Sequence, residues 1–270
     1  MCPACIATAG WIAAGATSAG GIAALVVNRN RKEKDMDVSK DLPKVASREA
    51  WLRARTKLLA KEKSFNRERD ALSAARRKLP LVALEKDYAF AGPDGRRTLG
   101  ELFAGRRQLI VYHFMFDPAW DEGCPACSFV ADHFDGALAH LAARDTSFAV
   151  VSRAPLAKIE AFRKRMGWRF AWLSAHGSDF NHDFRVTLDG AHPEYNYAPA
   201  AAQPEGYPRE GEREGMSVFV RDGERLFHSY STYQRGLDPF LNTYNFLDHT
   251  PLGRQEEDGI MRWVRHHDRY

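Results

Sequence analysis

The sequence contains four cysteines, and they form two copies of one motif: Cys2-Pro-Ala-Cys5 and Cys124-Pro-Ala-Cys127. Two cysteines one helical turn apart are close enough to join in a disulfide after a small adjustment. The spacing is typical of a dithiol redox site, but it also fits half of a zinc site or two inert cysteines in a helical turn. So few cysteines, so locally paired, do not suit a disulfide-stapled secreted scaffold.

The second pair lies where a predicted strand passes into a predicted helix. Residues 108–116 form an apolar, β-rich run that suits a strand buried on both faces, and residues 128–143 predict an amphipathic helix. The first backbone N–H groups of a helix are unpaired and favour an anion, so a cysteine there loses its proton more readily. We therefore expect Cys124 to be the attacking thiolate and Cys127, more buried, to resolve the mixed disulfide.

Other side chains are expected to line this site. Trp120, Asp121 and Glu122 directly precede the first cysteine, and the two acids would oppose formation of a thiolate. His113 lies in the strand beneath and is either a proton relay or a buried histidine with satisfied hydrogen bonds.

The composition is that of a soluble globular protein, with a formal net charge of +4. No Gly-rich phosphate loop is present, and we expect no cofactor and no nucleic-acid partner. Asp179, His182 and Asp183 are interpreted as a helix cap and turn rather than as metal ligands. Basic residues gather in a stretch that predicts a long helix over 47–80, where a solvated surface is favoured over contact with nucleic acid or anionic lipid.

Residues 6–27 carry no charge, and a basic stretch follows them directly. As a helix this run would be about 33 Å long at ~1.5 Å per residue, which just spans a bilayer core. Because Ala and Gly dominate, three interpretations stay open: a membrane anchor, a helix packed on a partner, and a free tail. If the run spans the inner membrane, the positive-inside rule places the rest of the chain in the cytoplasm. We divide the chain into an apolar helix with its basic flank (1–34), a linker (35–46) and one cytoplasmic domain (47–270).

The remaining sequence alternates strands and helices, which gives an α/β fold class. We predict a hairpin around Gly92 to Gly95, a short helix over 98–103, strands over 147–152 and 168–173, a helix over 156–166, a hairpin over 216–230 and a helix over 237–247. The β–α–β–α–β order implies parallel pairing through helical crossovers. Residues 186–213 are expected to be an inserted loop, and residues 251–270 a polar tail.

This order of elements resembles thioredoxin, and residues 98–127 are similar to the start of the peroxiredoxin-like branch. A more specific resemblance is to the bacterial thioredoxin-like family catalogued as domain of unknown function 899. Its recurrent phrases are YHFMF at 112–116, GCPACS at 123–128, SRAP at 152–155, GSDFN at 177–181, YSTY at 230–233 and LDHTP at 247–251. The resemblance covers roughly residues 47–270. It implies a thioredoxin-like central mixed sheet flanked by helices and no established reaction.

Two departures from these relatives bear on the chemistry. Thioredoxins place a cis-proline opposite the dithiol, where this sequence has Ser217; we expect a trans bond there, because cis before a non-proline costs about 2.5–4 kcal/mol. Peroxiredoxins have Thr or Ser three residues before the reactive cysteine, where this sequence has Asp121, so the motif does not support peroxidase chemistry.

Our principal hypothesis is a thiol–disulfide oxidoreductase that acts through Cys124 and Cys127 on a protein or small-molecule disulfide or thiol. Cys2 and Cys5 are a candidate second dithiol, which would exchange electrons with the first pair or share one zinc with it. The main alternative is a non-catalytic thioredoxin-like binding or scaffold module with structural or metal-bound cysteines. A membrane-surface adaptor that uses the basic helix is a further alternative.

Overall fold

The computed structural model describes residues 42–202 and 209–270. The expected apolar helix over 6–27 and the Cys2/Cys5 pair lie outside the described residues. Within the described ranges, no helix is both long and apolar enough to cross a membrane. Membrane association through residues 6–27 therefore stays a prediction.

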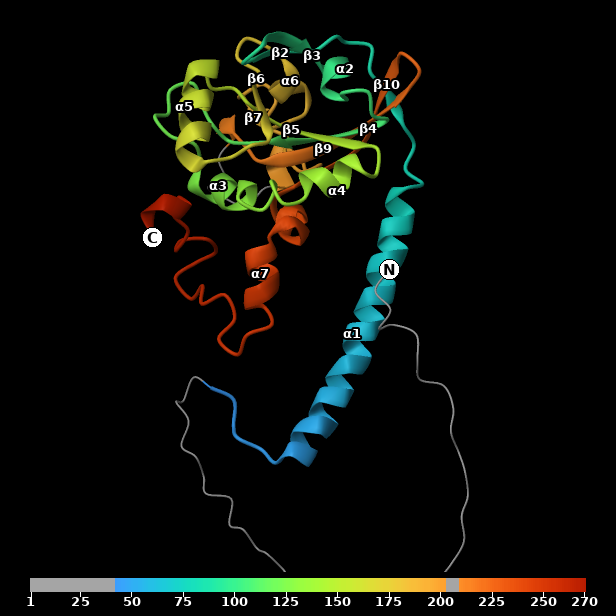
Figure 1. Ribbon diagram of the computed structural model, residues 1–270, viewed down its shortest axis with the longest axis vertical. Coiled ribbons are helices and arrows are strands. Elements are labelled where there is room, and N and C mark those ends of the chain that lie inside the picture. Colours follow the sequence, from blue (N-terminus) through green and yellow to red (C-terminus); the bar gives the residue numbers. More distant parts are fainter. Residues whose placement is uncertain (1–41, 203–208) are drawn as a thin grey trace, which may run out of the picture. The chain divides into compact units, whose positions relative to one another are not determined.

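A mixed β-sheet forms the centre of the fold (Figure 1). Its strands are β1 (Val82–Ala83), β2 (Ala89–Gly92), β3 (Gly95–Thr98), β4 (Gln108–His113), β5 (Thr146–Ser152), β6 (Ala171–Ser174), β9 (Gly215–Asp222) and β10 (Arg225–Tyr233). In the described part of the chain they are arranged in the order β1-β10-β9-β4-β5-β6-β2-β3. A separate pair of short strands, β7 (Thr187–Leu188) and β8 (Gly211–Glu212), joins the two ends of the predicted inserted loop.

The pairing around β4 is that of a thioredoxin-like fold. On one side β4 pairs in parallel with β5, and β5 pairs in parallel with β6, as the β–α–β–α–β alternation predicts. On the other side β4 pairs antiparallel with β9, which forms a hairpin with β10. The strand that leads to the second cysteine pair therefore lies in the middle of the sheet, where an apolar run is expected.

Helices connect these strands and cover both faces of the sheet (Figure 1). The α-helices are α1 (Arg48–Arg76), α2 (Leu99–Leu102), α3 (Pro125–Ala131), α4 (Leu138–Ala142), α5 (Leu156–Met166), α6 (Phe180–Asp183) and α7 (Asn242–Leu247), and the 3₁₀ helices are η2 (Ala200–Ala202), η3 (Gln234–Phe240) and η4 (His267–Arg269). The long helix predicted over 47–80 begins after its expected cap, Ser47, which accepts a hydrogen bond from the N–H of Ala50 at 3.2 Å. It ends at Arg76 and buries none of its residues.

Side-chain alternation along β4 divides the core into two layers. Tyr112 faces a cluster that includes Phe129 of α3, Ile159 of α5 and Tyr244 of α7. Val111 faces the opposite cluster, which includes side chains of α2 and α6. The cysteine helix α3 thus packs on the face of the sheet to which Tyr112 points.

Two predicted helices are shorter in the structure. The helix predicted over 128–143 is divided into α3 and α4 by a turn at residues 132–137. The helix predicted over 237–247 is divided into η3 and α7, because Pro239 lies inside the segment and lacks the N–H that an α-helix requires.

Candidate functional site

Cys124 occupies the N-cap position of α3, at the end of the loop that follows β4. Its N–H donates to the carbonyl oxygen of Met115 at 3.1 Å, which ties the start of the helix to the chain leaving the strand. The Ser128 N–H and hydroxyl both donate to the Cys124 carbonyl oxygen at 2.9 Å. Pro125, at the first helical position, has no N–H to leave unpaired there. The two cysteines therefore lie on the first turn of a helix, as the sequence predicts.

The two thiols differ in exposure and in acidity. Cys124 is half-buried, whereas Cys127 is 2 % exposed. Hydrogen bonding from the Cys127 thiol lowers the pKa of Cys124, and the backbone N–H groups of Cys127 and Ala126 act in the same direction against the cost of burial. Burial raises the pKa of Cys127 well above its usual range. A thiolate at Cys124 beside a protonated Cys127 is therefore the favoured charge state.

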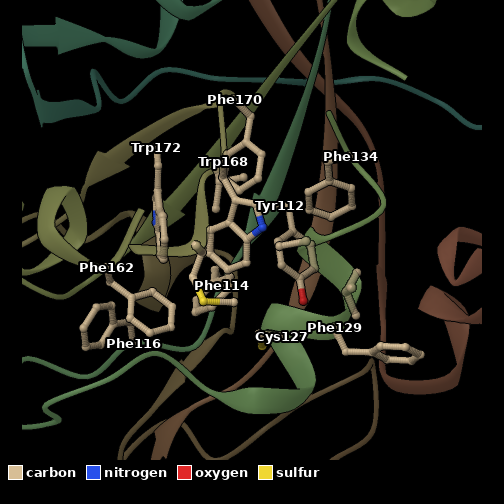
Figure 2. Close-up of a cluster of buried hydrophobic side chains, with 14 of the residues drawn as sticks. Tyr112, Phe114, Phe116, Cys127, Phe129, Phe134, Phe162, Trp168, Phe170 and Trp172 are labelled. Carbon is tan, nitrogen blue, oxygen red and sulfur yellow. The ribbon is translucent and has the colours of Figure 1, made fainter. Parts of the chain in front are cut away.

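Tyr112 lies beneath the buried thiol. Its ring packs edge-on against Phe134 with centroids 5.0 Å apart, and its hydroxyl points toward the helix that carries Cys127 (Figure 2). This hydroxyl has no nitrogen or oxygen partner among the described residues. Its interaction with Cys127 offsets part of the rise in the pKa of that thiol. The N–H of Met115 approaches the Cys127 sulfur at 3.5 Å, so both groups face the resolving position.

Glu214 is the acidic group that acts on the dithiol. It directly precedes β9 and lines the same cavity as both cysteines. Burial raises the pKa of its carboxyl, and its charge in turn raises the pKa of Cys124 and of Cys127. A negative charge here favours thiols over thiolates. Glu214 therefore limits the acidity that the helix gives to Cys124.

Cys124 borders two cavities. The first, of about 280 Å³, is mostly apolar and is lined by Tyr112, Met115, Cys124, Ala126, Cys127, Val130, Glu214, Gln234, Arg235, Leu237, Asp238, Leu241, Tyr244, Arg254, Ile260 and Met261. The second, of about 360 Å³, is lined by Trp120, Glu122, Gly123, Cys124, Pro125, Arg265, His266 and Arg269. Both contain residues of the C-terminal segment, which the sequence predicted to be only a polar tail.

The two acids before Cys124 are not among the largest influences on its pKa. Glu122 lines the second cavity with Trp120, but it is ion-paired with Arg165 at 2.6 Å and with Arg269. Its charge is therefore largely compensated. Asp121 is exposed and lines neither cavity. Opposition to the thiolate comes mainly from burial, with a smaller contribution from Glu214.

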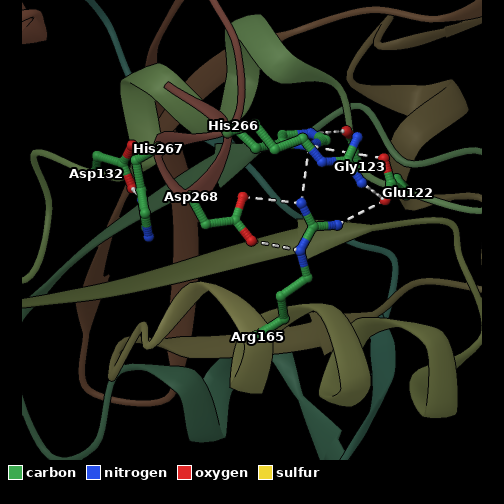
Figure 3. A network of polar contacts seen from close by, with 8 residues as sticks. Glu122, Gly123, Asp132, Arg165, His266, His267 and Asp268 are labelled. Atoms are coloured by element: carbon green, nitrogen blue, oxygen red, sulfur yellow. Dashed lines mark hydrogen bonds and ion pairs between the residues drawn. The ribbon is translucent and has the colours of Figure 1, made fainter.

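Polar contacts hold the C-terminal segment against the loop that precedes Cys124 (Figure 3). The buried ring of His266 bonds through Nε2 to the carbonyl oxygen of Gly123 at 2.9 Å. Arg165 of α5 binds both carboxylate oxygens of Asp268, at 2.7 and 2.9 Å, as well as Glu122. Two distant parts of the chain thus converge on Glu122 and Gly123, directly before Cys124.

The structure does not bring His113 and Ser217 to the dithiol. His113 follows Tyr112 in β4, so its side chain points to the opposite face, where it packs against Phe180 and Phe184. Its Nε2 is 2.8 Å from the hydroxyl of Ser217, which lies on that same face. His113 is therefore a buried histidine and not a relay beneath the cysteines. All peptide bonds of the described residues, including that before Ser217, are trans.

The acidic cluster of α6 has a structural role. The Nζ of Lys86 is 2.7 Å from a carboxylate oxygen of Asp179 and 2.8 Å from one of Asp183. Across the described ranges, no group of three or more His, Cys, Asp or Glu side chains is placed to hold a metal ion.

A family model described as "Bacterial protein of unknown function (DUF899)" matches residues 40–270. The chain belongs to this family. No curated protein matches it.

Three solved structures illustrate what the DUF899 chain is similar to. A mutant of PrxQ from Xylella fastidiosa shares 12 % identity, covering 62 % of this chain and 96 % of that one at a TM-score of 0.42. The peroxidoxin BcpB of Mycobacterium tuberculosis shares 15 %, covering 61 % and 95 % at 0.40. A mutant of peroxiredoxin Q from Xanthomonas campestris shares 16 %, covering 63 % and 97 % at 0.41.

Two parts of the DUF899 site were missed in the sequence. Glu214 directly precedes an apolar strand, and an acidic residue at the start of such a strand could have indicated a residue of the site. In the C-terminal segment the signal was the apolar run Ile260, Met261, Trp263 and Val264 in an otherwise polar stretch. These residues are too apolar for a free tail, and Val264 is 4 % exposed.

Proposed function

We propose that this protein is a thiol–disulfide oxidoreductase that acts through Cys124 and Cys127. One observation carries the proposal: within one helical turn, the thiol that borders the surface cavities has a lowered pKa and the buried thiol a raised one. Only a thiolate attacks a disulfide, and the attacking sulfur must be accessible. Cys124 meets both conditions.

The reaction proceeds in two exchanges. The Cys124 thiolate attacks one sulfur of a substrate disulfide, so that a Cys124–substrate bond forms, the substrate S–S bond breaks and one substrate thiolate leaves. Cys127 then attacks the Cys124 sulfur and its proton passes to the second half of the substrate, which leaves as a thiol as the Cys124–Cys127 disulfide forms; the thiolate released in the first exchange takes its proton from solvent. Two electrons pass from the dithiol to the substrate, and the reverse sequence oxidises a substrate dithiol.

Groups around Cys127 suit the second exchange. The Tyr112 hydroxyl and the Met115 N–H both face this sulfur, so each stabilises the anion that forms when its proton leaves. Its burial keeps the thiol protonated until the mixed disulfide brings a proton acceptor next to it. The two cysteines therefore have separate roles, attack at Cys124 and resolution at Cys127.

The proposal is tested on the full-length chain carrying Cys2→Ser and Cys5→Ser, in which only Cys124 and Cys127 can react. We expect the thiolate absorbance of Cys124 to titrate below the reference pKa of ~8.5, and the dithiol to reduce a disulfide with dithiothreitol as the regenerating reductant. Cys127→Ser should accumulate a mixed disulfide at Cys124, and Cys124→Ser should form none. An ordinary pKa at Cys124 together with no exchange would favour the non-catalytic module instead.

The N-terminal pair is tested by the same variants with Cys2 and Cys5 restored. If it is a second dithiol for this site, Cys127→Ser should trap a disulfide between Cys124 and Cys2 or Cys5. Absence of that crosslink would exclude electron exchange between the two cysteine pairs. Absence of bound zinc in the purified full chain would exclude a shared zinc site.

A further inference from the structure

The cavity of about 280 Å³ beside Cys124 has the properties of a substrate pocket. Its lining includes Leu237 and Leu241, which are 3 % and 1 % exposed, and the half-buried Cys124. A ligand seated on these side chains would lie in contact with the attacking sulfur. Ligand pockets in proteins are mostly apolar and of about 300–1,000 Å³, so this one lies just below that range and suits a small ligand.

Three charged residues of the lining, Arg235, Asp238 and Arg254, are already paired with charged partners. Arg254 is ion-paired with Asp248 at 2.6 Å and with Asp238 at 3.6 Å, and it lies 3.9 Å over the ring of Tyr244. Arg235 is ion-paired with Asp238 at 2.7 Å. A charged ligand would have to break one of these pairs to gain a partner. These paired residues therefore offer little to an ionic group.

The charge inside the cavity disfavours anions. Glu214 lines it beside both cysteines, and the carboxylate of Glu214 repels a negatively charged ligand. A cation would gain from Glu214 but would lose its water on entering a mostly apolar space. An uncharged, apolar group meets neither cost.

The wall formed by the C-terminal segment is held in place. Met261 adopts a left-handed backbone conformation with φ of +59°, which is uncommon outside glycine. Its N–H donates to Oε1 of Glu256 at 2.7 Å, and the same carboxylate accepts from Trp263 Nε1 at 3.1 Å and from the hydroxyl of Tyr244. Glu256 thus fixes a methionine, an adaptable apolar side chain, against the cavity.

From these observations we infer that the cavity binds the apolar half of a small, uncharged organic disulfide, which places one of its sulfurs against Cys124. The inference rests on the proposed function and names its substrate class. In the first exchange the bound half becomes attached to Cys124 and the other half leaves as a thiolate. In the second exchange Cys127 displaces the bound half, which takes the Cys127 proton and leaves as a thiol. With a solvent proton for the first thiolate, two electrons convert one disulfide into two thiols.

The test measures how fast the Cys2→Ser/Cys5→Ser chain reduces different disulfides. Four are small and of similar length: dibutyl disulfide, bis(2-hydroxyethyl) disulfide, the anionic 3,3′-dithiodipropionate and cationic cystamine. Insulin serves as a protein disulfide. Each rate is divided by the rate of the same disulfide with free dithiothreitol, which removes differences in intrinsic reactivity. We expect the normalised kcat/KM for dibutyl disulfide to exceed that for either ionic compound by about tenfold or more.

Two matched substitutions locate the preference. Ile260 and Phe246 are both exposed, at 62 % and 76 %, but only Ile260 lines the cavity. Ile260→Gln should lower the dibutyl rate by about threefold while changing the bis(2-hydroxyethyl) rate much less, and Phe246→Gln should change neither. Glu214→Gln should raise the dithiodipropionate rate relative to the dibutyl rate, because it removes the repelling charge.

The outcomes separate the inference from the function on which it rests. Exchange with every compound at similar normalised rates, or fastest with an ionic compound or with insulin, would overturn the apolar substrate class and leave the dithiol chemistry in place. Equal losses in Ile260→Gln and Phe246→Gln would also overturn it. No exchange with any of the compounds would overturn the proposed function itself.

Discussion

His113 lies fully buried among aromatic rings on the face of the sheet opposite the dithiol. A chain of hydrogen bonds, each of 2.8 Å, runs from its Nε2 through the hydroxyls of Ser217 and Ser231 to His228. Burial, with a smaller contribution from His228, lowers the pKa of His113 to about 3. This histidine is therefore neutral in the folded protein throughout the physiological pH range.

We predict that this histidine makes the protein less stable in acid. Its folded pKa of about 3 is below the ordinary value of ~6.5, so the unfolded chain binds the proton more readily. The contribution is fully present above pH ~6.5 and is lost as pH falls toward 3, which amounts to about 2 kcal/mol between pH 8 and pH 5. Urea unfolding at these two pH values measures it.

His113→Gln keeps a group that can bond to Ser217 but does not titrate. In this variant the difference in unfolding free energy between pH 8 and pH 5 should be smaller by about the same 2 kcal/mol. His228 has a pKa lowered by burial as well, so some acid sensitivity should remain. An identical pH dependence in the variant and the parent would show that the pKa of His113 is not lowered in the folded protein.

At the scale of elements, the loop before α3 approaches the core closely at Gly123. A Cβ built there would lie 2.6 Å from Cε1 of Phe114 and 2.9 Å from Cε1 of Phe162, and both rings belong to the buried cluster under the helix. Atoms cannot remain so close, so Gly123→Ala must displace the rings or the start of α3. We predict a loss of about 1–3 kcal/mol in unfolding free energy and a rise in the pKa of Cys124 as its helix start shifts.

Gly136, in the turn between α3 and α4, is the matched control. A Cβ there meets nothing within 4 Å. Gly136→Ala should therefore change the unfolding free energy by no more than about 0.5 kcal/mol, and the pKa of Cys124 by no more than the equivalent amount. Urea unfolding and thiolate titration of the two variants supply the comparison. If Gly123→Ala matched this control in both measurements, the close approach would have no bearing on the site.

Local sequence was sufficient to predict some elements, and α5 is the clearest case. Its predicted bounds, 156–166, match the structure because both ends carry local signals. Pro155 suits the start of a helix, and Gly167 adopts the left-handed conformation, φ of +67°, that ends one. The hairpin of β2 and β3 was likewise predictable from its Gly92-to-Gly95 turn.

The break between α3 and α4 depends on residues far away in the sequence. Asp132 accepts a hydrogen bond from Trp168 Nε1 at 2.8 Å. Asp135 accepts from the backbone N–H groups of Arg169 and Phe170, at 2.9 and 3.0 Å. These contacts draw residues 132–137 out of the helix toward the start of β6, and periodicity within the segment carries no sign of them. Tertiary contacts here override a helical pattern.

At the scale of the whole molecule, the dithiol could be located from sequence but its surroundings could not. The position of Cys124 follows from strand, loop and helix within one short segment. Glu214 reaches it only through the pairing of β9 with β4, and Met261 only through the return of the C-terminal segment. His113 and Ser217 were assigned to the wrong face, because a shift of one residue along a strand reverses the direction of the side chain.

The return of the C-terminal segment to the site depends on Arg165, which joins α5 to both that segment and the loop before Cys124. Its guanidinium binds Asp268 through two nitrogens and Glu122 through a third. Arg165 lowers the pKa of Asp268 to about 2, so the pair is intact at neutral pH. We predict that Arg165→Gln frees the segment and makes Cys124 react severalfold faster with a bulky maleimide, measured at neutral pH in the Cys2→Ser/Cys5→Ser chain.

Arg163→Gln is the control for charge and helix position, because Arg163 pairs with Glu160 within α5 and with no part of the C-terminal segment. Its maleimide rate should equal that of the parent chain. The two variants should also differ in limited proteolysis, with new cleavage between residues 251 and 270 only in Arg165→Gln. Equal alkylation rates in both would mean that His266, bonded to the Gly123 carbonyl oxygen, holds the segment without Arg165. In that case the control of access to Cys124 would belong to a buried hydrogen bond rather than to the ion pair of Arg165, and high salt would leave the rate unchanged.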